Sequence, residues 1–383
     1  MNLDFRSLRI AFDAKRITHN ATGLGNYGRT MVAMLARFAP QNRYDLYTPD
    51  PGRDELRRRL DGIPQLTFRY PRKPLHGPFK ALWRSFGLSR ELAPDTALFH
   101  GLSGELPSGL RKRGVRSVVT IHDLIFLRFP AYYKPVDRWI YTLKFRSACR
   151  RADRIIAISE ATKRDVMHFF GIPEQKIDVI YQGCDERFKH PVDAALLDDV
   201  RRRHALPDHY ILSVGSIEER KNLLLLLQAV AQLPAPRHVV AVGKRTPYTQ
   251  QVEEFAAAHG LTPYLHVLEG VSFDPLPALY QGADLFVYPS RYEGFGIPMI
   301  EAANCGVPSI GATGSCLEEA GGPGALYVDP DDPQELARRI EEVLGDEALR
   351  RRMVADGRAW VARFEPEVIA SELLSTYRKV LAL

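Results

Sequence analysis

The sequence predicts an α/β protein with two doubly wound domains, each built on its own parallel sheet. Short β-branched runs alternate with longer helical patterns along the chain, which is typical of strand–helix–strand units. These runs fall into two series, and the polar stretch 182–209 between them contains Pro191 and Pro207 but no apolar run. The chain has 383 residues, so each half is long enough to bury a core of its own.

The first series lies within residues 1–185, which we expect to form the N-terminal domain. Helical patterns separate its runs, for example over Asn26–Phe38 and Glu160–Phe170. The predicted strands of this domain are Leu8–Ala14, Tyr44–Thr48, Thr96–His100, Arg116–His122, Arg154–Ser159 and Lys176–Tyr181.

The second series lies within residues 186–364, the expected second domain. Its predicted strands are Tyr210–Gly215, Arg237–Val242, Leu265–Leu268, Ala283–Tyr288, Val307–Gly311 and Ala325–Val328. The remainder of the chain is helical in pattern, with a break near Phe364-Glu365-Pro366. Residues 365–383 are therefore predicted to form a separate terminal helix.

The charge of the chain is divided unevenly between its halves. Residues 1–180 hold 32 Lys and Arg against 17 Asp and Glu, a net charge of 32 − 17 = +15. The remaining residues hold 20 basic against 29 acidic side chains, or −9. A basic half attracts nucleic acid, anionic lipid or an anionic small substrate, and charge alone does not choose among them.

The sequence also argues against a secreted, a membrane-spanning and a zinc-binding protein. The four cysteines are scattered without a C-x-x-C pair, which is typical of reduced thiols in a cytosolic protein. The first six residues lack the apolar core of a signal peptide, and the longest apolar stretch, Leu223–Val230, is too short to span a bilayer. The histidines have no zinc-ligand spacing, so we expect no metal site. The expected location is cytoplasmic, with any membrane contact peripheral.

The most specific motif runs from Tyr288 to Ala302, where a predicted strand passes through a glycine loop into a helix that has Pro298 near its start. Ligands of open α/β sheets bind beyond the carboxyl ends of strands, and a helix N-terminus suits a phosphate. Glu293 on the loop and Glu301 in the helix suit hydroxyl groups instead. Together they predict a ligand with phosphate and polyol parts, a nucleotide sugar. In the alternative interpretation, Glu301 only complements the helix dipole and the glycines only form a turn.

A second motif, Gly215-Ser-Ile-Glu-Glu-Arg220-Lys221, follows the first strand of the second half. Two adjacent cations there can clamp a diphosphate, Arg220 by its planar fork and Lys221 as a point charge. The alternative is a solvated helix start. The expected position of this pair, at the same sheet edge as Glu293, favours the diphosphate clamp.

Two candidates lie in the first half. His122 ends the predicted strand Arg116–His122, where a neutral imidazole can donate to a sugar hydroxyl or shuttle a proton, although a structural histidine held by Asp123 fits the sequence better. Gly23-Leu-Gly25-Asn-Tyr-Gly28 is a literal G-x-G-x-x-G. A dinucleotide fingerprint opens directly after its strand, whereas residues 15–22 intervene here. We therefore predict a flexible, substrate-facing loop.

The motifs as a set resemble those of family-four glycosyltransferases with the GT-B architecture, over most of the chain. The most specific element is the Glu-x7-Glu pair Glu293 and Glu301, with Gly306-Val-Pro308 and Tyr327-Val-Asp-Pro330 around it. The resemblance implies two Rossmann-like domains that face a central cleft, with acceptor bound by the first and nucleotide sugar by the second. It further implies that the terminal helix packs back on the first domain. His100-Gly-Leu-Ser-Gly-Glu-Leu-Pro107 is similar to enzymes that build bacterial surface polysaccharides, often mannosyltransferases.

The resemblance also implies a role for each motif residue. Glu301 would bind the nucleotide ribose and Glu293 the donor sugar, helped by the backbone N–H groups of Gly294, Phe295 and Gly296. Arg220 and Lys221 would neutralise the diphosphate without a metal, and Ser216 would contact a phosphate. His122 would line the sugar pocket, and Gly23 and Gly25 would approach the donor phosphate and the acceptor. Val271 and Ser272 would lie near the base. Many relatives have arginine where this chain has Ser216, so phosphate binding depends more on Arg220 and Lys221.

The sequence therefore predicts a retaining, metal-independent glycosyltransferase that needs no cofactor. Its best-fitting reaction moves mannose from GDP-mannose to a glycan or lipid-linked acceptor in polysaccharide or lipopolysaccharide synthesis, with peripheral inner-membrane contact through the basic domain. One alternative is a sugar-nucleotide epimerase or a phosphorylase on the same fold. A further alternative is a nucleic-acid-binding protein, because aromatic and basic residues interleave over residues 132–146.

Overall fold

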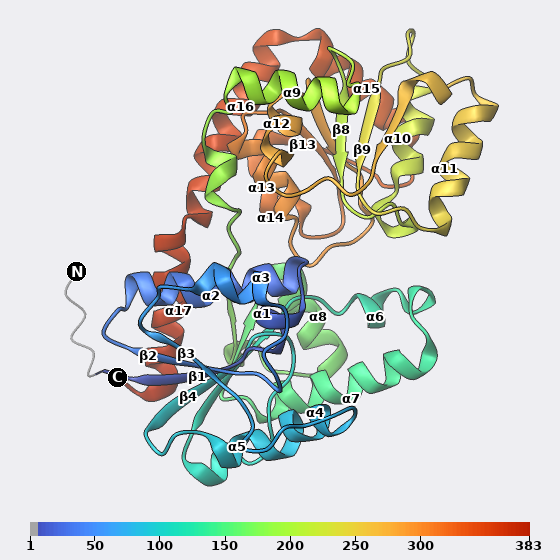
Figure 1. Ribbon diagram of the computed structural model, residues 1–383. Helices are drawn as coiled ribbons and strands as arrows, with labels where there is room; N and C mark the ends of the chain where they lie inside the picture. Colours follow the sequence, from blue (N-terminus) through green and yellow to red (C-terminus); the bar gives the residue numbers. More distant parts are fainter. Residues whose placement is uncertain (1–6) are drawn as a thin grey trace. The chain divides into compact units, whose positions relative to one another are not determined.

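The computed structural model describes residues 7–383, which form two compact units (Figure 1). The first unit ends at Gln182 and takes in Pro366–Leu383, and the second comprises Gly183–Glu365. The division predicted from the sequence falls after residue 185, and the predicted terminal helix begins at residue 365. Residues 1–6, from which the absence of a signal peptide was inferred, lie outside the described part of the chain.

The first unit is built on one parallel sheet of seven strands in the order β3-β2-β1-β4-β5-β6-β7. Each of the six strands predicted for this half is present. The seventh, β3, was missed because it is a short edge strand that alternates half-buried with exposed residues. The strands are β1 (Arg9–Asp13), β2 (Arg43–Tyr47), β3 (Leu66–Arg69), β4 (Thr96–Gly101), β5 (Arg116–Ile121), β6 (Arg154–Ala157) and β7 (Ile177–Val179).

Helices cover this sheet, and the last of them comes from the far end of the chain. The helix α17 (Pro366–Leu381), red in Figure 1, packs against α2, β4 and β5. Its Tyr377 hydroxyl bonds His100 Nδ1 at 2.7 Å inside the core. The other helices are α1 (Lys15–His19), α2 (Gly23–Phe38), α3 (Asp54–Arg57), α4 (Phe79–Leu82), α5 (Leu88–Glu91), α6 (Ile125–Arg128), α7 (Pro135–Arg151) and α8 (Glu160–Phe170).

The flexible loop predicted at Gly23–Gly28 is wrong. Gly23 is the first residue of α2, and the preceding segment forms α1 rather than a loop. Gly25 allows the two helices to approach closely, because a Cβ there would lie 1.8 Å from the carbonyl oxygen of Asn20. The glycine spacing therefore serves helix packing.

The second unit has a parallel sheet of six strands in the order β10-β9-β8-β11-β12-β13, and all six were predicted. These strands are β8 (Ile211–Val214), β9 (Val239–Val242), β10 (Leu265–Leu268), β11 (Leu285–Tyr288), β12 (Ser309–Ala312) and β13 (Ala325–Val328). The helices are α9 (Ala194–His204), α10 (Leu223–Val230), α11 (Pro247–Ala258), α12 (Leu276–Gln281), α13 (Ile297–Asn304), α14 (Leu317–Gly321), α15 (Pro333–Gly345) and α16 (Glu347–Val361).

The strand order reverses once in each unit, between β1 and β4 in the first and between β8 and β11 in the second. In open α/β sheets, ligands bind beyond the carboxyl ends of the strands at such a reversal. The fold therefore directs attention to the segments that follow β1, β4, β8 and β11. No helix within residues 7–383 combines the length and apolar composition that a membrane span requires.

Candidate active site

The segments after β8 and β11 bring the two predicted motifs of the second unit together. After β8 the chain turns at Gly215, whose φ of +145° favours glycine, and then enters a short helical turn that contains Arg220 and Lys221. After β11 it runs through Ser290 to Glu293. The backbone N–H of Arg291 donates to the Arg220 carbonyl at 2.8 Å, which ties the two segments to each other.

Glu293 is the centre of this arrangement. Its Oε1 accepts from Lys221 Nζ at 2.5 Å, from Arg220 at 2.8 Å, from the Tyr288 hydroxyl at 3.0 Å and from the Ser290 hydroxyl at 2.5 Å. Burial by itself raises the pKa of Glu293, but the charges of Lys221 and Arg220 outweigh it and lower that pKa to about 2. Glu293 is therefore a carboxylate at any physiological pH.

The second oxygen of Glu293 is in a different position. All four bonds are made by Oε1, and Oε2 has no hydrogen-bond partner within residues 7–383. The fully buried unpaired atoms of these residues do not include Oε2. Part of its surface is therefore exposed, and a ligand can reach it. A fixed, charged acceptor with one open oxygen is suited to a sugar hydroxyl.

Arg220 and Lys221 also keep unused donors. Arg220 binds Glu293, Glu218 at 2.6 Å and the Tyr292 carbonyl at 2.6 Å, which leaves part of its five-donor fork open. Lys221 donates to Glu293 and to the Tyr288 hydroxyl, two of its three available bonds. Both cations are thus held in place and can still accept an anion.

Glu301 lies one turn into α13 and is buried. Its Oε2 accepts from the Tyr280 hydroxyl at 2.8 Å, whereas its Oε1 has no hydrogen-bond partner in the described chain. Burial, with a smaller effect from Asp185, raises the pKa of Glu301 to about 7. The two carboxylates therefore share one design, in which one oxygen is anchored and the other is open.

The glycine loop before α13 has a fixed shape. Gly296 has φ of +115°, and a Cβ there would lie 2.8 Å from Leu317 Cδ2. The thiol of Cys316 bonds the carbonyls of Glu293 at 3.1 Å and Phe295 at 2.8 Å. Gly294 and Phe295 lie between these anchors, and Pro298 occupies the first turn of α13 as predicted.

Sequence reasoning missed the residues that orient the two carboxylates. Tyr288 and Ser290 lie within the motif Tyr288–Ala302, whereas Tyr280 and Cys316 lie outside the recognised motifs. Their signal in the sequence is weak because tyrosine, serine and cysteine are also common in cores. Only their hydrogen bonds distinguish them.

Three predicted site residues are not joined to this centre. Ser216 is an exposed residue of the segment after β8. Val271 and Ser272 lie in the segment after β10, which is two strands away from β8 in the sheet. No hydrogen bond of the described chain connects these three side chains to Glu293 or Glu301.

The candidates of the first unit lie at the reversal of its own sheet. His122, the residue after β5, bonds the Leu102 carbonyl through Nε2 at 2.8 Å and packs edge-on against Tyr27, with 4.6 Å between ring centroids. A carbonyl only accepts, so Nε2 carries the hydrogen and Nδ1 carries the lone pair. Burial lowers the pKa of His122 to about 4, with a smaller effect from Arg16. The imidazole is neutral and suits a hydroxyl rather than a phosphate.

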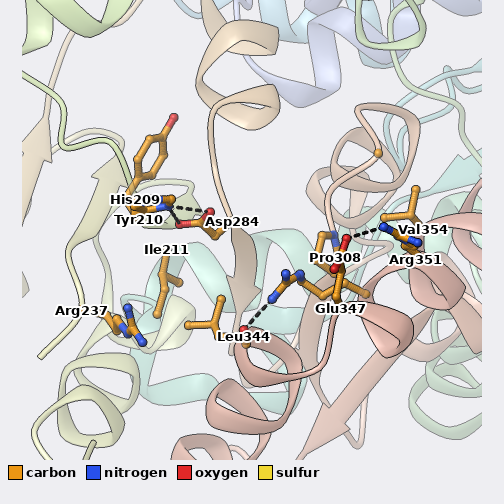
Figure 2. A pocket seen from close by; sticks show the side chains of 12 residues that line it. His209, Tyr210, Ile211, Arg237, Asp284, Pro308, Leu344, Glu347, Arg351 and Val354 are labelled. Atoms are coloured by element: carbon orange, nitrogen blue, oxygen red, sulfur yellow. Dashed lines mark hydrogen bonds and ion pairs between the residues drawn. The ribbon is translucent and has the colours of Figure 1, made fainter. Parts of the chain in front are cut away.

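A separate pocket of about 630 Å³ lies at the opposite edge of the second sheet, where β8, β11 and β12 begin (Figure 2). It is lined by Tyr210, Asp284 and Pro308, with Arg237 and Arg351 at its sides. None of the residues given an individual role in the predicted site lines it, although Gly306 and Pro308 of the Gly306-Val-Pro308 motif do. Within residues 7–383, His, Cys, Asp and Glu side chains form no group of three that would hold a metal.

Two family models match the chain, one in each half. The model described as "Glycosyltransferase Family 4" matches residues 23–188, and the one described as "Glycosyl transferases group 1" matches residues 198–360.

Among curated proteins, O-antigen chain mannosyltransferase B of Escherichia coli is 28% identical, and the match covers 97% of this chain and 100% of that protein. The serotype-specific mannosyltransferase WbdA of Escherichia coli is 31% identical over 76% of this chain, which spans 37% of that longer protein.

Among solved structures, HepE from Anabaena in complex with UDP and glucose superposes with a TM-score of 0.75 at 17% identity, covering 97% of this chain and 100% of that one. WaaG, a glycosyltransferase involved in lipopolysaccharide biosynthesis, superposes with a TM-score of 0.68 at 15% identity, covering 97% of this chain and 99% of WaaG.

Proposed function

The chain belongs to the family-four glycosyltransferases of the GT-B fold and is a nucleotide-sugar-dependent enzyme, and from this premise we propose how its residues perform the transfer. The donor binds at the carboxyl edge of the second sheet. The ribose hydroxyls of the donor donate hydrogen bonds to Glu301 Oε1, and its diphosphate binds to Arg220 and Lys221. A hydroxyl of its sugar donates a hydrogen bond to Glu293 Oε2. The observation that carries this assignment is the pair of buried carboxylates, each with one oxygen anchored and one open.

Catalysis in this proposal is mainly electrostatic. The bond between the anomeric carbon and the diphosphate breaks, and Arg220 and Lys221 stabilise the negative charge that develops on the leaving oxygen, a task for which other enzymes use a metal. The departing phosphate takes the proton of the acceptor hydroxyl as the new glycosidic bond forms on the same face. The anomeric configuration is thereby retained.

We further propose mannose, delivered as GDP-mannose, as the donated sugar, and a glycan or lipid-linked acceptor of cell-surface polysaccharide or lipopolysaccharide synthesis. The support is the printed function of the mannosyltransferases named above, one of which matches along its whole length. The proposed location is cytoplasmic, at the inner face of the membrane.

An apolar surface on the basic first unit supports peripheral membrane contact. On α7, Val136, Trp139, Ile140 and Leu143 recur at helical spacing and are exposed, Trp139 to 64%. Phe79, on α4, is 61% exposed, and Leu82 and Phe86 continue its stripe. Residues 70–90 carry five Lys and Arg and no Asp or Glu, which suits an anionic leaflet.

The donor site is tested by the substitution Lys221→Ala. Loss of one cation from the leaving group should lower kcat about 10²–10³-fold, while Glu293 keeps its bonds to Arg220, Tyr288 and Ser290 and the fold survives. Arg339→Ala, which removes a half-exposed cation on α15 of the same unit, is the matched control. Transfer should be assayed with GDP-mannose and with UDP-sugars, and products analysed for a new glycosidic bond, an isomerised donor or a sugar 1-phosphate. Full activity of Lys221→Ala would refute the assignment.

A further inference from the structure

Two adjacent cations, Lys15 and Arg16, lie directly after β1, where the strand order of the first sheet reverses. Both are half-buried, and neither side chain has a hydrogen bond or ion pair with any residue from 7 to 383. Arg29 in the same unit, by contrast, donates to the carbonyls of Ile17 and Asn20 and to the Asn26 side chain. A partly desolvated charge without a partner costs stability, which is a mark of a site kept for a ligand.

The neighbouring charges leave this place positive. Arg84 is buried and binds both Asp13 and Glu105, and Lys144 also pairs with Glu105 at 3.5 Å. Lys15 lies beside the same groups, because its backbone N–H donates to Asp13 Oδ1 at 3.1 Å. Burial lowers the pKa of Lys15, and the charges of Arg84 and Arg16 lower it further. Asp13 and Glu105 are thus already engaged by Arg84 and Lys144, whereas Lys15 and Arg16 make no ion pair in the described chain. Two positive charges remain for an incoming anion.

A hydroxyl-binding group lies beside these cations. His122 follows β5, and Lys15 and Arg16 follow β1, so all three lie at the carboxyl edge of one parallel sheet, with only β4 between the two strands. The Arg16 charge is one of the causes that lower the pKa of His122. The His122 Nδ1 lone pair accepts a hydrogen bond from a hydroxyl, but it cannot donate one to a phosphate oxygen. The cations and the imidazole therefore suit a ligand that carries both groups, the hydroxyl of a sugar and a phosphoryl group close to it.

We infer that Lys15 and Arg16 form an anion subsite of the first unit that binds a phosphoryl group of the acceptor. The inference rests on the proposed function, and it narrows the acceptor to a phosphate-bearing one. It also gives a local reason for the excess positive charge of this half, because the subsite is built from side chains that no ion pair neutralises. Neither residue belongs to a motif that the sequence analysis recognised.

Direct binding measurements test this inference without an acceptor assay. The chain is first saturated with GDP and, separately, with UDP so that Arg220 and Lys221 are occupied. Farnesyl diphosphate, inorganic pyrophosphate and farnesol are then titrated by calorimetry. Wild type should bind the two phosphates more tightly than farnesol. The double variant Lys15→Gln/Arg16→Gln should weaken both phosphates about ten-fold or more and leave farnesol and nucleotide binding unchanged.

The matched control is Lys112→Gln, an exposed cation before β5 at the opposite edge of the same sheet, which should bind all ligands as wild type does. Three results would overturn the inference: unchanged phosphate binding by the double variant, an equal loss of nucleotide binding, or no phosphate binding by wild type. In the last case, sugar transfer to an acceptor without phosphate would show that the proposed function stands and only the subsite is wrong. Absence of both nucleotide binding and transfer would instead remove the proposed function.

Discussion

Glu293 and Glu301 are both buried carboxylates, and their surroundings move their pKa values in opposite directions. Lys221 and Arg220 hold Glu293 ionised, with a pKa of about 2, whereas Glu301 has no cation against it and its pKa is about 7. Glu293 therefore presents a permanent charge. Glu301 gains its full charge only when the pH exceeds about 7, and a charged oxygen accepts hydroxyl donors more strongly.

Donor affinity should consequently rise with pH through the Glu301 pKa. Between pH 6 and pH 8 the ionised fraction of a group with a pKa of about 7 grows about ten-fold, which sets the upper limit of the effect. The measurement is the Kd of GDP-mannose, whose diphosphate has no ionisation in this range. Glu301→Gln should bind more weakly and show a flat profile. The same slope in wild type and variant would contradict a ribose contact at Glu301.

How much of the site was predictable from sequence depended on spacing. The loop-to-helix motifs can be recognised in the sequence because each follows a predicted strand, and they contain Glu293, Glu301, Arg220 and Lys221. The structure brings Glu293 together with both cations. Lys15 and Arg16 were not recognised, because two cations after a strand look like a solvated surface. Only the tertiary arrangement shows that Asp13 and Glu105 are taken by Arg84.

At the scale of elements, the contact between α1 and α2 shows what the glycine pattern does. Gly25 faces the Asn20 carbonyl at a distance no side chain tolerates, whereas a Cβ at Gly23 would meet nothing within 4 Å. Sequence spacing argued against a dinucleotide fingerprint there, but it predicted a loop for the segment. The intervening residues form a short helix, and a five-residue helix leaves too little periodicity to be read.

This contact predicts different effects for two neighbouring substitutions. Gly25→Ala forces α1 and α2 apart and should lower the free energy of unfolding by about 1–3 kcal/mol. Gly23→Ala fills open space at a helix start and should be neutral or slightly stabilising, since alanine favours helices. Thermal or urea denaturation of both variants measures the difference. Equal stabilities would mean that the two helices do not pack as described.

At the scale of the whole molecule, twelve of thirteen strands were predicted because buried parallel strands are short apolar runs, and only the half-exposed edge strand β3 escaped. The charge division also follows from the sequence. The exposed apolar stripe that begins on α4 does not, because a sequence pattern cannot distinguish an apolar face that is covered from one that is open.

Those stripes predict binding to anionic membranes. The substitutions Trp139→Ser and Phe79→Ser remove exposed apolar area from a basic face and should weaken co-sedimentation with phosphatidylglycerol vesicles several-fold, without a change in stability. Leu196→Ser, an exposed position on α9 of the second unit, is the control. Wild-type binding should also fall with salt and be weak on phosphatidylcholine. Equal binding by wild type and the two variants would remove these stripes from the interface.

The central claim is that four side chains form the donor site. The open oxygens of Glu293 and Glu301 bind hydroxyl groups of the donor, and Arg220 and Lys221 bind its diphosphate. A crystal structure of the chain with GDP-mannose tests it most directly. The account predicts ribose hydroxyls on Glu301 Oε1, the diphosphate on Arg220 and Lys221, and a sugar hydroxyl on Glu293 Oε2. A nucleotide bound instead in the pocket at the opposite edge of the sheet, beside Arg237 and Arg351, would contradict it.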